Sequence, residues 1–134
     1  MLHDFIFHHL GIATANIERT SDFYIHAGYT ISPIITDQIQ DVNICFLTRP
    51  ASPLIELVSP LSIASPVSKI IQNSGVTPYH TCYEVVDLNK SILLLKQKKF
   101  LPLFKPVPAI ALENQLICFL YNKDFGLIEL LQSK

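Results

Sequence analysis

The chain has 134 residues, of which 49% are hydrophobic and only 16% are charged, and its formal net charge is −1. This composition predicts one folded domain with a sizeable core, and it argues against intrinsic disorder and against a broad basic surface for nucleic acid. The apolar residues come in short runs rather than in a stretch of about 20, so we expect no membrane span, and we also expect no signal peptide. Three cysteines in apolar runs, without a Cys-x-x-Cys pair, predict reduced thiols in a cytoplasmic protein.

The first half of the chain has the pattern of a strand, a helix and three further strands. Residues 5–13 alternate so that His9 faces one side of a strand and His8 the other. A helix beginning at Asn16 and ending near Gly28 follows, with Ile17, Phe23, Tyr24 and Ala27 as its apolar stripe. The remaining segments are a strand over 29–35 interrupted by Pro33, a polar loop over 37–41, and a hairpin of 42–47 with 54–58.

The second half predicts the same order of elements. A connecting segment, residues 59–78, contains a short helix over 67–72 with Ser65 as its cap and Pro66 in its first turn. After it we expect a strand over 79–86, a helix over 88–98 capped by Asp87, a strand over 100–104, a proline-rich loop, and strands over 116–120 and 127–131.

Two four-residue motifs occur twice in the sequence, and the two copies of each motif are 73 residues apart. Ile-Cys-Phe-Leu begins at Ile44 and at Ile117, and Leu-Ile-Glu-Leu begins at Leu54 and at Leu127. Two copies are too few for a solenoid, so we expect them to close on each other about a pseudo-twofold axis. The fold class is therefore α+β: one domain over residues 1–134, with a first module of about 5–58, a linker of 59–78 and a second module of about 79–132.

The repeat places a histidine and a glutamate at equivalent positions of each half. His9 and His80 lie on the first strands, and Glu56 and Glu129 lie on the last ones, inside apolar runs where a charge is costly unless it is paired or binds a metal. Each residue alone has an ordinary structural explanation, but their equal spacing favours a shared site. Two imidazoles and two carboxylates suit one divalent transition metal, such as Co, Ni, Zn or Mn. Such an ion could polarise a carbonyl and hold the enolate, with Glu129 or Glu56 moving the proton.

Four stretches resemble the vicinal oxygen chelate superfamily, which includes glyoxalase I, methylmalonyl-CoA epimerase, extradiol dioxygenases and bleomycin-resistance proteins. They are residues 8–13, residues 55–62 continuing into 65–67, residues 79–85 and residues 126–130, and the Pro-Leu-Ser and Ser-Pro pair of the linker is closest to the epimerase branch. The resemblance implies two βαβββ modules that form a metal-binding cleft, with metal ligands at His9, Glu56, His80 and Glu129. Epimerases often have glutamine at the second position, whereas glyoxalase I has glutamate.

One position departs from the epimerase pattern. Epimerases resemble one another in a glutamate before the third strand of the first module, and that place is Ile39 here, between Asp37 and Asp41. Either aspartate could substitute if the loop shifts; otherwise a reaction with one base fits better. Glu113 is the second-module counterpart of Gln40 and could point into the cleft from the symmetric side, but its place in a polar turn favours exposure.

The leading hypothesis is a metal-dependent isomerase or lyase that acts through a metal-stabilised enolate, most closely an acyl-CoA epimerase. Glyoxalase I-like lactoylglutathione lyase activity on a thiol adduct is the second alternative, and a non-catalytic small-molecule-binding or resistance protein is the third. The expected partners are a small-molecule substrate and a second copy of the chain in a homodimer. Substrate identity, the metal and the presence of a second acid/base stay open from the sequence.

Overall fold

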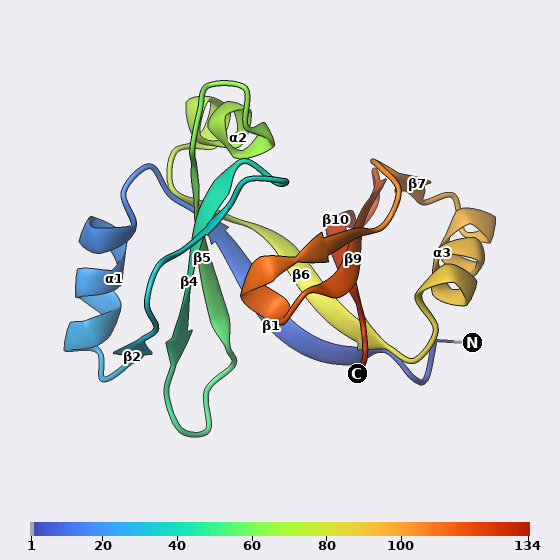
Figure 1. The fold of residues 1–134 in the computed structure, drawn as a ribbon, viewed down its shortest axis with the longest axis horizontal. Coiled ribbons are helices and arrows are strands. Elements are labelled where there is room, and N and C mark those ends of the chain that lie inside the picture. The colour runs from blue at the N-terminus through green and yellow to red at the C-terminus, as the bar shows by residue number, and fades with distance from the viewer. Residues whose placement is uncertain (1) are drawn as a thin grey trace. The chain divides into compact units, whose positions relative to one another are not determined.

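The computed structural model describes residues 2–134 (Figure 1). These residues form two compact units, one of residues 9–79 and one of residues 80–134 with the first described residues up to 8. None of the helices in the described part of the chain is long and apolar enough to cross a membrane.

The unit of residues 9–79 is a sheet with helices α1 and α2. Its elements are β1 (Ile6–Ala13, which starts in the other unit), α1 (Ile17–His26), β2 (Thr30–Ile31), β3 (Ile35–Asp37), β4 (Val42–Thr48), β5 (Ile55–Pro60) and α2 (Pro66–Ser74). Strand β5 pairs in parallel with β1 and in antiparallel with β4, and β2 and β3 both pair with β4 in antiparallel.

The other unit repeats this connectivity. Its elements are β6 (Thr77–Val85), α3 (Leu88–Gln97), β7 (Leu101–Pro102), β8 (Val107–Ala109), the 3₁₀ helix η1 (Ile110–Leu112), β9 (Gln115–Asn122) and β10 (Gly126–Gln132). Strand β10 pairs in parallel with β6 and in antiparallel with β9, and β7 and β8 both pair with β9. The predicted α+β fold class, with a strand–helix–strands pattern that occurs twice, is confirmed.

Each predicted helix start is confirmed by a side chain that accepts a backbone N–H. Asn16 accepts from the backbone of Arg19 at 2.9 Å, and Asp87 accepts from that of Lys90 at 3.0 Å. Ser65 caps α2 in the same way, with Pro66 in the first turn. These bonds satisfy backbone donors that have no partner inside the helix.

The predicted apolar stripe of α1 is wrong in two of its four members. Phe23 is 70% exposed and Ala27 is exposed, whereas Ile17 and Ser21 are buried. Positions 17, 21 and 24 follow helical steps of four and three, so they share the face that packs on the sheet. Phe23 lies one position off that face, where its ring meets the edge of the Tyr24 ring at 5.4 Å.

The edge segments of both sheets also differ from the prediction. The expected strands over 29–35 and 100–104 shrink to the two-residue strands β2 and β7, and the proline-rich loop contains β8 and η1. Asp37 is not part of a solvated loop, because it ends β3 and is only 2% exposed. Its carboxylate accepts hydrogen bonds from the backbone and the side chain of Gln40, at 3.0 and 2.8 Å, which compensates for its burial.

Each unit has its own apolar core between the sheet and a helix. One core contains Ile12, Ile17, Cys45, Leu47, Ile55 and Leu57. The other contains Val85, Leu88, Ile92, Leu95, Phe100, Cys118, Leu120 and Leu130. The repeated sequence motifs therefore supply equivalent core positions in the two units. Cys45 and Cys118 are buried thiols outside any disulfide, as predicted.

Candidate metal centre

The first histidine–glutamate pair lies across the parallel strands β1 and β5. Glu56 on β5 is in register with Gly11 on β1. His9 stands two residues before Gly11, so its side chain is on the same face of the strand. The His9 Nε2 atom lies 3.5 Å from the Glu56 Oε1 atom, and the two residues are 0% and 4% exposed. Strand register alone therefore brings this imidazole and this carboxylate together.

The second pair is built in the same way on β6 and β10. Glu129 is in register with Cys82, two residues after His80. The His80 Nε2 atom lies 3.2 Å from the Glu129 Oε1 atom, and both residues are 3% exposed. The identical offset of two residues in both units explains why the histidines and glutamates have nearly equal spacing in the sequence.

An aromatic ring stands beside each pair. Phe46 is opposite Glu56 in the β4–β5 hairpin, and Phe119 is opposite Glu129 in the β9–β10 hairpin. The centroid of Phe46 lies 6.0 Å from that of His9 at an interplanar angle of 73°, and Phe119 lies 5.1 Å from His80 at 85°. An edge-to-face contact of this kind restricts rotation of the imidazole.

The contacts of Phe46 and Phe119 with the histidines were not predicted, although the repeated sequence motif contains the pattern that indicates them. Phenylalanine is the third residue of the repeated Ile-Cys-Phe-Leu motif. Alternation along a strand places this phenylalanine and the preceding cysteine on opposite faces. Cys45 and Cys118 belong to the cores, so the phenylalanines had to face the side that carries the histidines.

The chemistry of these donors fits a divalent transition metal. Each pair offers an imidazole nitrogen and a carboxylate oxygen inside a buried setting, where an uncompensated carboxylate is costly. Burial, and secondarily the negative charge of Glu56, raises the pKa of the Cys45 thiol to about 11. Cys45 belongs to the core, on the face of β4 opposite to Phe46, so its thiol is directed away from the first histidine–glutamate pair.

The residues considered as a second acid/base have other contacts. Ile39 is 64% exposed, in the turn after β3. Asp37 is held by Gln40, and Asp41 accepts a short hydrogen bond from the Ser62 hydroxyl. Both aspartates thus stabilise the loop that carries them. Glu113 is exposed, as expected, and forms an ion pair with Lys134.

A sequence profile of the Glyoxalase/Bleomycin resistance protein/Dioxygenase superfamily matches residues 8–119. The matched range begins one residue before His9, and it includes the His9–Glu56 pair and His80. The chain therefore belongs to this superfamily.

Within the superfamily, the chain is similar to methylmalonyl-CoA epimerases. Human mitochondrial methylmalonyl-CoA epimerase is 30% identical over 129 residues, which cover 93% of this chain and 72% of the relative. The crystal structure of methylmalonyl-CoA epimerase from Mycobacterium tuberculosis superposes with a TM-score of 0.83 at 25% identity, covering 96% of this chain and 87% of that one. A hypothetical protein from Bacillus halodurans C-125 superposes with a TM-score of 0.85 at 28% identity, covering 97% and 95%. The predicted resemblance to the epimerase branch is confirmed.

Proposed function

We propose that the chain is a metal-dependent enzyme that epimerises an acyl-CoA at the carbon next to its thioester carbonyl. The observation that carries this proposal is the pair of buried His–Glu contacts with the same strand register. Similarity over 93% of the chain to methylmalonyl-CoA epimerase favours an acyl-CoA over a thiol adduct.

We propose that His9, Glu56, His80 and Glu129 together bind one divalent ion. Neutral imidazole nitrogens and carboxylate oxygens are suitable ligands for Co, Ni, Zn or Mn. Both carboxylates are nearly excluded from solvent, so a cation would offset the cost of burying them. The ion, when bound, supplies a Lewis acid for the substrate carbonyl.

The protein's own side chains have separate tasks in this proposal. The two histidines act as neutral ligands, and each is held in orientation by a phenylalanine ring. Glu129 takes the proton from the carbon next to the carbonyl. Inversion requires a proton to be delivered to the opposite face of that carbon. We assign this step to Glu56, which would leave the ion and carry the proton as a neutral carboxyl group, because Asp37 and Asp41 are engaged in their loop.

The test combines metal content with hydrogen exchange. Elemental analysis of the purified chain, loaded with Co, Ni, Zn or Mn, should give one ion per chain, and methylmalonyl-CoA in heavy water should exchange its α-proton. The variant His80→Ala, Glu129→Ala should lose both the ion and the exchange. The control His26→Ala, Glu113→Ala removes an exposed histidine and an exposed glutamate, and it should retain both.

Two outcomes would contradict the proposal in different ways. If no ion binds after loading with any of the four metals, the chain is a binding member of the superfamily that kept the residues of the scaffold. If an ion binds but no acyl-CoA exchanges its proton, a hemithioacetal of glutathione becomes the substrate to examine. Glu56 favours this second candidate, because a carboxylate at that position resembles glyoxalase I.

The organisation of the chain is part of the same proposal. We infer that the two units work as a single domain over residues 1–134 and that the protein is a homodimer. Several large apolar side chains are exposed, which suits a buried interface between two copies: Ile6, Val76, Val86 and Phe125. Light scattering coupled to size exclusion would give twice the chain mass for a dimer. The cytoplasmic location stays a prediction.

A further inference from the structure

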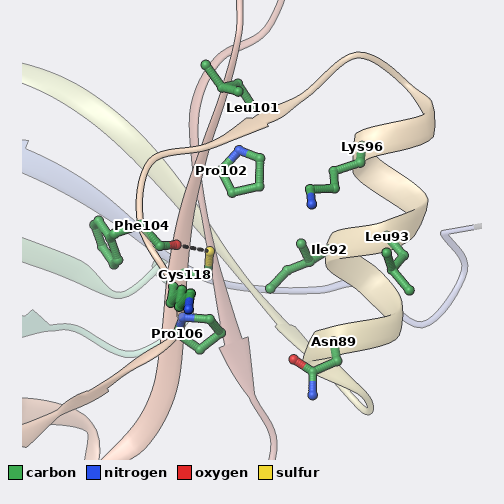
Figure 2. Close-up of a pocket in the computed structure, with 10 residues that line it drawn as sticks. Asn89, Ile92, Leu93, Lys96, Leu101, Pro102, Phe104, Pro106 and Cys118 are labelled. Carbon is green, nitrogen blue, oxygen red and sulfur yellow. Dashed lines mark hydrogen bonds between the residues drawn. The ribbon is translucent and has the colours of Figure 1, made fainter.

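A cavity of about 550 Å³ lies in the unit of residues 80–134, between α3 and the segment that links β7 to β8 (Figure 2). Its lining residues are Asn89, Ile92, Leu93, Lys96, Leu101, Pro102, Phe104, Lys105, Pro106 and Cys118. This volume is in the range of sites that take small ligands.

The cavity lies on the opposite side of β9 from the His80–Glu129 pair. Cys118 and Phe119 are consecutive residues of β9, so their side chains point to opposite faces. Phe119 contacts His80, whereas Cys118 belongs to the core beneath α3. None of the lining residues is a candidate metal ligand; the lining residue nearest to them is Phe104, whose ring packs on Phe119 at 6.1 Å.

The walls of the cavity are apolar, and several are fixed in place. Pro102 and Pro106 stand at the two ends of the segment between β7 and β8, and their rings restrict its backbone. The Cys118 thiol donates a hydrogen bond to the Phe104 carbonyl at 3.3 Å, shown as the dashed line in Figure 2. Leu93 and Leu101 are 60% and 65% exposed, so large apolar side chains border the opening.

The polar part of the lining is positively charged. Lys96 and Lys105 contribute two ammonium groups, and the lining residues include no aspartate or glutamate. Figure 2 shows Ile92 and Lys96 extending from α3 toward Cys118 and Pro102. Burial raises the pKa of the Cys118 thiol, and the positive charge of Lys96 opposes part of this rise.

Comparison of the two repeats shows that the charge is specific to the second one. A step of 71 residues from α3 to α1 places Ile25 where Lys96 stands and Glu18 where Asn89 stands. Burial and the charges of Glu56 and Glu18 together raise the pKa of Cys45, the counterpart of Cys118. The first repeat thus has an isoleucine and a glutamate where the second has Lys96 and Asn89, so the positive charge of the cavity does not follow from the fold alone.

We propose that this cavity is a binding site for an apolar carboxylate, in which the hydrocarbon packs against Ile92, Pro102 and Pro106 and the carboxylate is held by Lys96 and Lys105. The two lysines favour a ligand with a negatively charged carboxylate group, and the apolar lining favours a ligand with a hydrocarbon chain. The site is independent of the metal and of the proposed reaction.

The experiment is a titration with octanoate, followed by amide ¹H–¹⁵N chemical shifts of the full chain. Saturable shifts should cluster in residues 89–96, 101–106 and 118. Lys96→Gln, Lys105→Gln should weaken binding about tenfold, since each partly exposed charge contact contributes only modestly. The control Lys90→Gln, Lys98→Gln changes two lysines of the same helix region outside the lining and should bind like the parent chain.

Two further probes decide the chemistry of the ligand. Octan-1-ol has the same chain without the charge, and it should bind more weakly than octanoate by about the factor that the lysine variant loses. Shifts that do not saturate, or equal binding by both lysine variants, would overturn the proposal. Displacement of octanoate by free coenzyme A would overturn it as well, because the cavity would then belong to the proposed substrate.

Discussion

At the scale of single residues, the rings beside the histidines are the contacts most open to test. Phe119→Leu keeps an apolar side chain but removes the edge-to-face contact with His80. Such contacts contribute about 0.5–1.5 kcal/mol, so we expect Co²⁺ to bind roughly two- to tenfold more weakly, as measured by calorimetry. Phe125→Leu changes a 73% exposed ring of the same unit and should leave the affinity unchanged. Equal losses in both variants would mean that the ring stabilises the unit only in a general way.

The buried Cys45 thiol predicts a pH dependence of stability. Its pKa rises from an ordinary value of 9.0 to about 11 in the folded chain. The folded state therefore keeps a proton that the unfolded state releases, and this contribution is complete below pH 9 and is lost as the pH rises toward 11. Urea unfolding between pH 8 and 11 should show a smaller decline for Cys45→Ala than for the parent chain. Parallel declines would contradict the shift.

The sequence predicted residues that occur at equivalent positions in both halves better than residues that occur in one half only. Equal spacing pointed to His9 and Glu56 as a pair, and the strand register places them 3.5 Å apart; their role as metal ligands stays a proposal. Asp37 could not be predicted as buried, because its burial depends on two hydrogen bonds from Gln40. Phe23 was misplaced because the apolar face of α1 is narrow and includes Ser21.

At the scale of elements, long strands and capped helices were predictable and short edge strands were not. Strand β5 and the α3 cap Asp87 have strong local signals: a mostly apolar run and a hydrogen-bond acceptor before the helix. Strands β7 and β8 have only two or three residues each, and they exist because β9 offers free edge positions to pair with. Pairing of this kind depends on tertiary contacts rather than on the local sequence.

The start of α3 is joined to the end of β10 by one side chain. The side-chain oxygen Oε1 of Gln132 accepts a hydrogen bond from the backbone N–H of Leu88 at 2.8 Å. The side-chain nitrogen Nε2 of Gln132 donates a hydrogen bond to the backbone carbonyl of Val86 at 2.6 Å. Gln132→Ala removes both hydrogen bonds, of which one is part-buried and the other is exposed to solvent, so we expect a loss of about 0.5–1.5 kcal/mol in the free energy of unfolding. Gln97→Ala, at the exposed end of the same helix, should change it by less than about 0.5 kcal/mol. Urea denaturation measures both, and similar values would show that the connection adds little.

At the scale of the whole molecule, the repeat determines what each half can provide. Each unit has its own apolar core, its own set of paired strands and one buried His–Glu pair. One imidazole and one carboxylate are too few to hold a transition metal tightly, whereas structural and catalytic sites use three or four protein ligands. A single ion bound by both pairs would make the two units depend on each other.

This dependence predicts how metal binding changes thermal unfolding. An ion present at about 100 times its dissociation constant stabilises the folded chain by about 2.7 kcal/mol, which corresponds to a rise in Tm of roughly 8 °C for a chain of this size. Scanning calorimetry with Co²⁺ should show one transition at the higher temperature. Because the proposed ion would be bound by both pairs, Glu56→Gln and Glu129→Gln should each reduce this rise strongly, whereas the exposed-site control Glu113→Gln should retain it. If either variant alone kept the full rise, or if two ions bound to each chain, the pairs would act as separate sites and the single-domain proposal would be wrong.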